Sequence, residues 1–169
     1  MGHIYLYTGT GGGKTTNALG LALRSLGHNH KVVIIQFMKW WKKTGEYKIR
    51  KRLKGYEIYQ FGRKGWKELG KLDERDKFLA KRGLKFAKRI MKKKKPHLLV
   101  LDEINLAVYC KLLDVKEVLE LLAKIPKRTD VVLTGRYADK KLIRKADFVN
   151  EIIDRKHPKK IPLTKGIQY

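Results

Sequence analysis

Between two apolar runs the chain reads Thr8-Gly-Thr-Gly-Gly-Gly-Lys-Thr-Thr16. The run before it, residues 3–7, has the character of a β-strand, and residues 14–26 have that of a helix. Glycines let such a turn curl so that successive backbone N–H groups point at one anion, and the following helix adds the positive end of its dipole. The stretch is therefore predicted to be a phosphate-binding loop for a nucleoside triphosphate.

Each part of this loop has an expected task. The Lys14 ammonium is placed to reach the outer phosphates, and the Thr15 hydroxyl is placed to ligate Mg²⁺. The strict pattern for such loops has glycine where this chain has Thr8, so the match is incomplete at one end. The predicted phosphate-binding residues of the loop are Gly9, Thr10, Gly11, Gly12, Gly13, Lys14, Thr15 and Thr16.

A second motif lies downstream, where the apolar run at 97–101 ends in Asp102-Glu103. In phosphate-loop proteins an aspartate at the end of such a strand holds Mg²⁺, directly or through water, opposite the threonine of the loop. The adjacent Glu103 has two interpretations, a second metal contact or the base that activates water in an ATPase. The predicted Mg²⁺ ligands are Thr15, Asp102 and Glu103.

A further candidate is Arg136, which follows the apolar run at 130–134 and a glycine. Ligands of open parallel sheets bind at the carboxyl edge, where this residue would emerge near Asp102. Arg136 is therefore expected to hold a phosphate, and a surface arginine after a turn glycine is the alternative interpretation.

Strand-like and helix-like segments alternate along the whole chain. This pattern, with the phosphate loop, predicts an α/β fold, a single P-loop NTPase-like (RecA-type) domain over 1–169 with a mainly parallel sheet flanked by helices. Residues 155–169 are expected to be an extended C-terminal tail. The expected strands are 3–7, 31–37, 56–61, 97–101, 130–134 and, more weakly, 147–153; the expected helices are 14–26, 73–94, 115–124 and 138–145. The third of these helices has a capping-box spacing, with Asp114 three residues before Glu117.

The composition is strongly basic, with 41 Lys and Arg against 16 Asp and Glu in 169 residues and a net charge of +25. Such a field attracts nucleic acid or acidic proteins, and it keeps open a phosphate-loop ATPase that acts on nucleic acid. The lysines are spread along helix faces rather than in a stripe, so a solvated, ion-rich surface is the preferred interpretation and nucleic acid is not the expected partner.

A cytoplasmic location is expected from three features of the sequence. Cys110 is the single cysteine, so no internal disulfide can form and a reducing compartment is the default. The first strand begins two residues in, which leaves no signal peptide before it. No apolar run approaches the roughly 20 residues of a membrane span, so no membrane association is expected.

Several segments, in this order and spacing, together resemble the phosphate-loop class of ATP:corrinoid (cob(I)alamin) adenosyltransferases. The resemblance runs nearly from end to end and is more specific than the phosphate loop alone. The matching segments are residues 7–16, 20–27, 33–39, 45–46, 101–105, 112–118, 132–136, 146–147, 156–158 and 165–169.

The resemblance implies transfer of the 5′-deoxyadenosyl group of ATP to the Co(I) centre of a corrinoid, with triphosphate as the leaving group and Mg²⁺ as cofactor. Cobalt is then the nucleophile, so no catalytic nucleophile or base is expected from the protein. A place in cobalamin biosynthesis and a homodimer are also implied, and a basic surface would suit an acidic electron-transfer protein.

Two of the chain's departures from the family pattern fall on residues expected to contact the substrates. Thr10 and Gly12 stand where the family commonly has asparagine and a first lysine, which removes one cation from the loop. The Gly-Phe-Thr-Trp segment that shields the lower face of the corrin is represented only by Lys64-Gly-Trp66. Trp66 and Phe61 are therefore the residues expected to shield the corrinoid.

Overall fold

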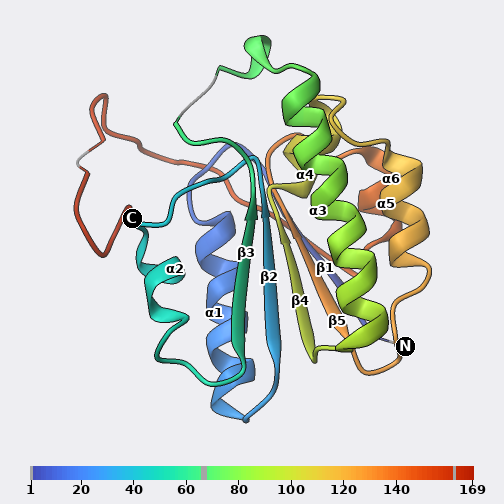
Figure 1. Ribbon diagram of the computed structural model, residues 1–169. Helices are drawn as coiled ribbons and strands as arrows, with labels where there is room; N and C mark the ends of the chain where they lie inside the picture. Colours follow the sequence, from blue (N-terminus) through green and yellow to red (C-terminus); the bar gives the residue numbers. More distant parts are fainter. Residues whose placement is uncertain (1, 66–67, 162) are drawn as a thin grey trace.

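The computed structural model describes residues 2–65, 68–161 and 163–169. Its centre is a six-stranded sheet in which neighbouring strands pair in parallel, in the order β3-β2-β4-β5-β1-β6 (Figure 1). The strands are β1 (Ile4–Thr8), β2 (Val32–Phe37), β3 (Tyr56–Phe61), β4 (Leu98–Asp102), β5 (Asp130–Thr134) and β6 (Phe148–Glu151).

Helices cover both faces of this sheet. α1 and α2 lie on one face, and α3, α4, α5 and α6 lie on the other (Figure 1). The bounds are α1 (Lys14–Gly27), α2 (Gly45–Ile49), α3 (Glu74–Lys93), α4 (Ile104–Tyr109), α5 (Val115–Leu122) and α6 (Lys140–Lys145), with a 3₁₀ turn at Leu69–Lys71. The predicted capping box opens α5: the Asp114 carboxylate accepts from Lys116 N at 2.8 Å, and Asp114 N donates to Glu117.

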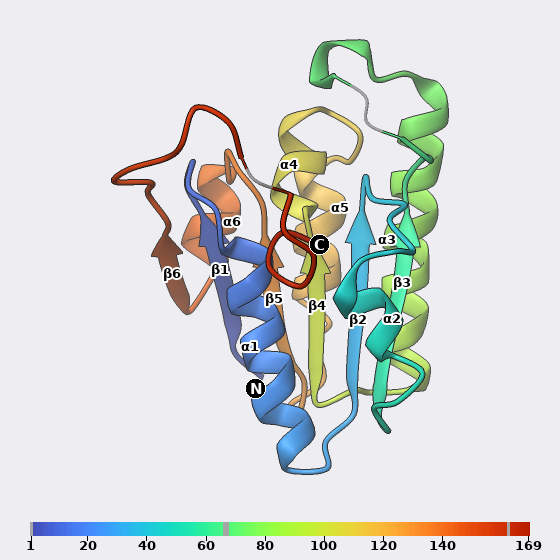
Figure 2. The ribbon, with the colours of Figure 1, turned by 90° about the vertical axis from the view of Figure 1, so that its left-hand side faces the viewer.

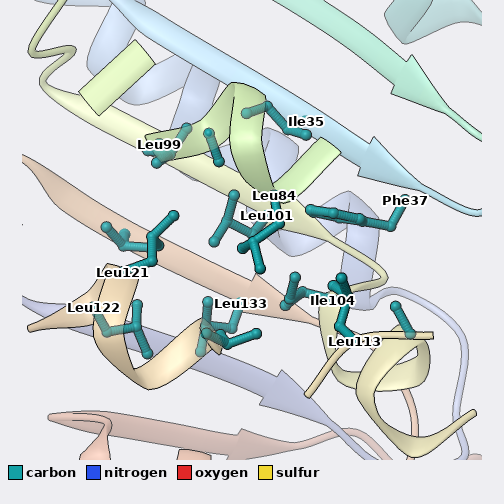
Figure 3. Close-up of a cluster of buried hydrophobic side chains, with 14 of the residues drawn as sticks. Ile35, Phe37, Leu84, Leu99, Leu101, Ile104, Leu113, Leu121, Leu122 and Leu133 are labelled. Atoms are coloured by element: carbon teal, nitrogen blue, oxygen red, sulfur yellow. The ribbon is translucent and has the colours of Figure 1, made fainter. Parts of the chain in front are cut away.

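The continuous apolar runs reflect strands that are buried on both faces. Along β2, Val33, Ile35 and Phe37 face the core under α3, whereas Val32 and Ile34 face α1. Figure 3 shows the larger core, where side chains of β2, β4 and β5 interdigitate with Leu84 of α3 and with residues of α4 and α5. Burial on both faces explains why these strands read as unbroken runs rather than as alternating ones.

The predicted fold class is confirmed, and the predicted strands and long helices are present with boundaries shifted by a few residues. The sheet is parallel throughout rather than mainly so. Two short helices were not predicted, α2 within a segment expected to be irregular and α4 directly after the Asp102-Glu103 pair. None of the helices in the described ranges is long and apolar enough to cross a membrane.

The parallel arrangement brings the carboxyl ends of all the strands to one edge, seen at the top of Figure 2. The turns after β1, β2, β3, β4 and β5 therefore meet there. The described residues of 155–169 form neither helix nor strand, are exposed, and run back along the face that carries α1 and α2 (Figure 2).

Candidate functional site

The turn between β1 and α1 has the backbone of a phosphate-binding loop. Gly9 and Gly13 have φ angles of 98° and 100°, in the region that disfavours side chains. A Cβ on Gly9 would also lie 2.3 Å from the carbonyl oxygen of Ile152. Glycine at this position is therefore required both by the backbone angle and by the close approach of the chain that follows β6.

The segment that follows β6 is hydrogen-bonded to the phosphate loop. Gly11 N donates to Ile152 O at 2.8 Å, and Gly12 N donates to Asp154 Oδ1 at 3.1 Å. The Asp154 carboxylate thus accepts a hydrogen bond from the Gly12 amide, which the sequence predicts to bind phosphate. An anion that enters the loop must compete with this carboxylate for the Gly12 amide.

The Lys14 ammonium lies inside the loop and donates to Gly11 O. The side chain is buried, and burial, followed by the positive charge of Arg136, lowers its pKa below the usual lysine value. Both effects penalise the charged form in the absence of an anion. A bound polyphosphate would relieve this penalty, because it would place negative charge between the two cations.

Asp102 lies at the end of β4 with no exposed surface, and its carboxylate accepts four hydrogen bonds. Its Oδ1 accepts from Thr15 Oγ1 at 2.8 Å and from Thr134 Oγ1 at 2.6 Å. Its Oδ2 accepts from Gln36 Nε2 at 3.0 Å and from Lys39 Nζ at 2.7 Å. Burial alone would raise the Asp102 pKa, but the Lys39 charge and these hydrogen bonds outweigh it and lower the pKa, so the carboxylate is ionised.

For Glu103, the next residue, the pKa is shifted upward, in the direction opposite to that of Asp102. Its backbone adopts a φ of 62°, and its N–H donates to Thr134 Oγ1 at 3.0 Å. Its Oε1 lies 3.7 Å from Lys39 Nζ. Burial raises the pKa of Glu103, the neighbouring Asp102 charge raises it further, and Lys39 offsets this only in part. The two carboxylates therefore differ in how readily each is ionised.

A cavity of about 420 Å³ opens at this edge of the sheet, within the size range of small-molecule sites. It brings together most of the residues singled out from the sequence. Those that line it are Gly11, Gly12, Gly13, Lys14, Thr15, Phe61, Glu103 and Arg136. Asp102 lies buried beneath it, bonded to Thr15. Gly9 and Thr10 of the same turn, and Thr16 of α1, do not line the cavity.

The cavity is also lined by apolar side chains. They come from the end of β3, from the segments after β2 and β3 and from α4, and they are Met38, Trp41, Phe61, Leu69, Leu72 and Leu106. Arg63 fixes the turn after β3 to the start of α3, since its Nε lies 2.9 Å from Asp76 Oδ1. Trp66, the other predicted shielding residue, lies outside the described residues.

Sequence reasoning missed three polar groups of the site. Gln36 is hidden in an apolar strand, and Asp154 comes from the far end of the chain. Lys39 lies two residues beyond the end of β2, so the carboxyl-edge argument applied to Arg136 would also have found it. Lys39 Nζ donates to Thr15 Oγ1 at 3.1 Å as well as to Asp102, which places it at the centre of the polar network.

The sequence is similar to those of several known proteins. A corrinoid adenosyltransferase of a Sinorhizobium species is 35% identical over 162 residues, covering 93% of this chain and 74% of that protein. The corrinoid adenosyltransferase of Pseudomonas aeruginosa is 32% identical, covering 99% and 84%. That of Escherichia coli K12 is also 32% identical, covering 92% and 79%. These names do not favour an ATPase that acts on nucleic acid.

The family model described as ATP:corrinoid adenosyltransferase BtuR/CobO/CobP matches residues 1–169. The match therefore spans the phosphate loop, the Asp102-Glu103 pair and the tail together, as the resemblance of the sequence implied. The chain belongs to the ATP:corrinoid adenosyltransferase family and is a transferase.

Proposed function

We propose that the site transfers the 5′-deoxyadenosyl group of ATP to the Co(I) centre of a corrinoid and releases triphosphate. The observation that carries the assignment is the mixed lining of the cavity. The phosphate loop, Lys14 and Arg136 line it together with Phe61 and other apolar side chains. The cationic groups suit a triphosphate, and the apolar groups suit a large, flat ring system.

In this reaction the phosphate loop holds a leaving group. As the C5′–O bond of ATP breaks and the C5′–Co bond forms, the electron pair of the broken bond stays on the triphosphate. Amides and cations that already point at this position stabilise the growing charge without reorganisation. We assign this task to the residue 9–13 backbone, to Lys14 and to Arg136. The nucleophile is the substrate cobalt, so the protein orients two substrates and supplies no base.

The residues present also fit a magnesium ion. The Thr15 hydroxyl and the carboxylates of Asp102 and Glu103 converge on one cationic group, the Lys39 ammonium, at 3.1, 2.7 and 3.7 Å. Magnesium is typically bound by one or two carboxylates together with phosphate oxygens. We propose these three residues as its ligands, where Mg²⁺ would neutralise part of the triphosphate charge.

The apolar part of the cavity lining is proposed to receive the corrinoid. Phe61 is half-buried, packs against Gly83 and Phe86 of α3, and lines the cavity. Leu69 and Leu72, which the sequence did not single out, extend the same surface. We propose that Phe61 and these leucines shield the lower face of the corrin, together with Trp66 as the resemblance implies.

The proposal extends to location and partners. The single cysteine and the net charge of +25 suit a cytoplasmic protein that receives electrons from an acidic electron-transfer protein. Electrostatic docking of this kind weakens as salt screens the charges. The homodimer implied by the resemblance is tested by sedimentation.

The Asp154 carboxylate leads to a first prediction about nucleotide affinity. Asp154→Asn keeps an acceptor for Gly12 N but removes a negative charge beside the incoming phosphates. Because Asp154 is exposed, the effect is that of a surface charge, about 0.2–1 kcal/mol, or up to roughly fivefold tighter ATP binding. Calorimetric titration at low and high salt measures it, with Glu120→Gln on α5 as the control. Equal ATP affinity of Asp154→Asn and the unmodified protein at low salt would contradict the competition.

The products of ATP test the proposed reaction. The protein is incubated with MgATP, with and without reduced corrinoid, and the phosphate products are separated. We expect triphosphate, one per ATP consumed, and only when the corrinoid is present. Accumulation of ADP and phosphate without corrinoid would mean that the site hydrolyses ATP, and Glu103 would then be the first candidate for the base that activates water.

A further inference from the structure

Lys39 contacts all three proposed magnesium ligands. Its Nζ lies 2.7 Å from Asp102 Oδ2, 3.1 Å from Thr15 Oγ1 and 3.7 Å from Glu103 Oε1. An ammonium group at this point leaves no room for a divalent ion on the same oxygens, because Mg²⁺ binds oxygen at about 2.0–2.1 Å. The two cations must therefore exchange.

The fold places Lys39 there through the turn after β2. Met38 follows the strand with a φ of 57°, and its N–H donates to Phe61 O at 3.0 Å, which ties the turn to the end of β3. The chain is thereby directed over the carboxyl edge, and the flexible lysine stem reaches the end of β4. The Lys39 side chain keeps 22% of its surface exposed, whereas Asp102 keeps none. Lys39 is thus the partner with room to move.

Asp102 needs a cation at all times. A fully buried, ionised carboxylate is costly unless a positive charge compensates it, and its other three donors are the neutral groups of Thr15, Thr134 and Gln36. Lys39 supplies that charge when the metal is absent. Magnesium that binds alone must displace the Lys39 ammonium into water. In return it gains only the oxygen ligands that the ammonium vacates.

Magnesium that binds together with a triphosphate displaces the Lys39 ammonium at a lower cost in free energy. The phosphates add oxygen ligands to the metal, and they also offer a new partner to the displaced ammonium, because Lys39 lines the same cavity as Lys14 and Arg136. We propose that Lys39 is an internal counter-ion that magnesium displaces, so that the metal binds tightly only together with the triphosphate. The inference rests on the proposed metal site, and it assigns Lys39 a positioning role in ordering the substrates.

The test measures metal binding without corrinoid, so that it does not depend on adenosyl transfer. Mn²⁺ replaces Mg²⁺ as a paramagnetic probe, and its Kd is measured by electron paramagnetic resonance with and without ATP. The variants are Lys39→Met, which keeps the length without the charge, and Lys39→Gln, which keeps a hydrogen-bond donor. Lys43→Met, an exposed lysine of the same turn, is the matched control.

We expect the unmodified protein and Lys43→Met to bind Mn²⁺ weakly alone and at least 100-fold more tightly with ATP. In Lys39→Met and Lys39→Gln, the Kd for Mn²⁺ alone should fall at least tenfold. The factor by which ATP tightens Mn²⁺ should shrink correspondingly, and by linkage so should the factor by which Mn²⁺ tightens ATP. Lys39→Arg, which keeps a cation, should restore the original coupling.

Two results separate the inference from the proposal on which it rests. Equal or weaker Mn²⁺ binding in both neutral variants, including no binding without ATP, would overturn the counter-ion role of Lys39. If Mn²⁺ binding with ATP were also insensitive to Thr15→Val, the metal site itself would be wrong. A protein that passes both tests but forms no adenosylated corrinoid would contradict only the proposed reaction.

Discussion

Replacing Lys14 by alanine is expected to lower the rate of adenosyl transfer by on the order of 10²–10³-fold, the usual effect of removing one preorganised donor to a developing charge. Lys14 is the buried cation of the phosphate loop, and burial and the Arg136 charge lower the pKa of its ammonium, so the added charge of a triphosphate would favour the charged form. The effect should therefore appear in kcat as well as in ATP affinity. Initial rates at saturating and limiting MgATP separate the two.

The fold should tolerate this change, because the Lys14 ammonium donates to the carbonyl oxygen of Gly11, within the loop itself. Lys85→Ala, an exposed lysine on α3, is the matched control and should keep full activity. If Lys14→Ala retained more than about a tenth of the rate with unchanged thermal stability, the loop could not be the principal support of the leaving group.

Asp102→Asn is expected to have the largest effect on stability. The Asp102 carboxylate accepts from four donors, and an asparagine offers one oxygen and an N–H₂ group, so at least one buried donor would face another donor. The penalty for an unsatisfied, charge-adjacent group is roughly 2–4 kcal/mol, reduced from a full buried-pair value because Lys39 can turn toward water. For a chain of this size that corresponds to a fall in Tm on the order of 5–15 °C.

Thermal and urea unfolding without ligands measure this penalty directly. Asp139→Asn serves as the control, since Asp139 caps α6 by accepting from Lys141 N and asparagine caps a helix equally well. An Asp102→Asn protein within about 0.5 kcal/mol of the original would contradict the four-donor network.

The fold followed from the sequence because its signals are local and strong. Unbroken apolar runs such as Val32–Ile35 report burial on both faces, and the Asp114–Glu117 box reports a helix start. The short helix α4 gave no such signal. It begins after Glu103, which has a positive φ and makes no side-chain cap hydrogen bond, and it has only six residues, too few for a periodic apolar pattern to stand out.

The site was predictable where chemistry and spacing coincide, and not where the fold brings distant residues together. Lys14, Thr15, Glu103 and Arg136 meet at one cavity as the carboxyl-edge rule requires. By contrast, the place of Asp154 on the Gly12 amide depends on the pairing of β6 with β1, which no local pattern encodes. The chemical roles of these site residues are predictions that the experiments above test.

The most direct measurement of the central claim follows the cobalt itself. Chemically reduced cob(I)alamin is mixed with MgATP and the protein under strictly anaerobic conditions, and the absorbance spectrum is recorded. The account predicts conversion of the Co(I) spectrum to that of an alkylcobalamin, with one adenosyl group transferred per ATP consumed. An unchanged Co(I) spectrum while ATP is converted to ADP and phosphate would contradict it.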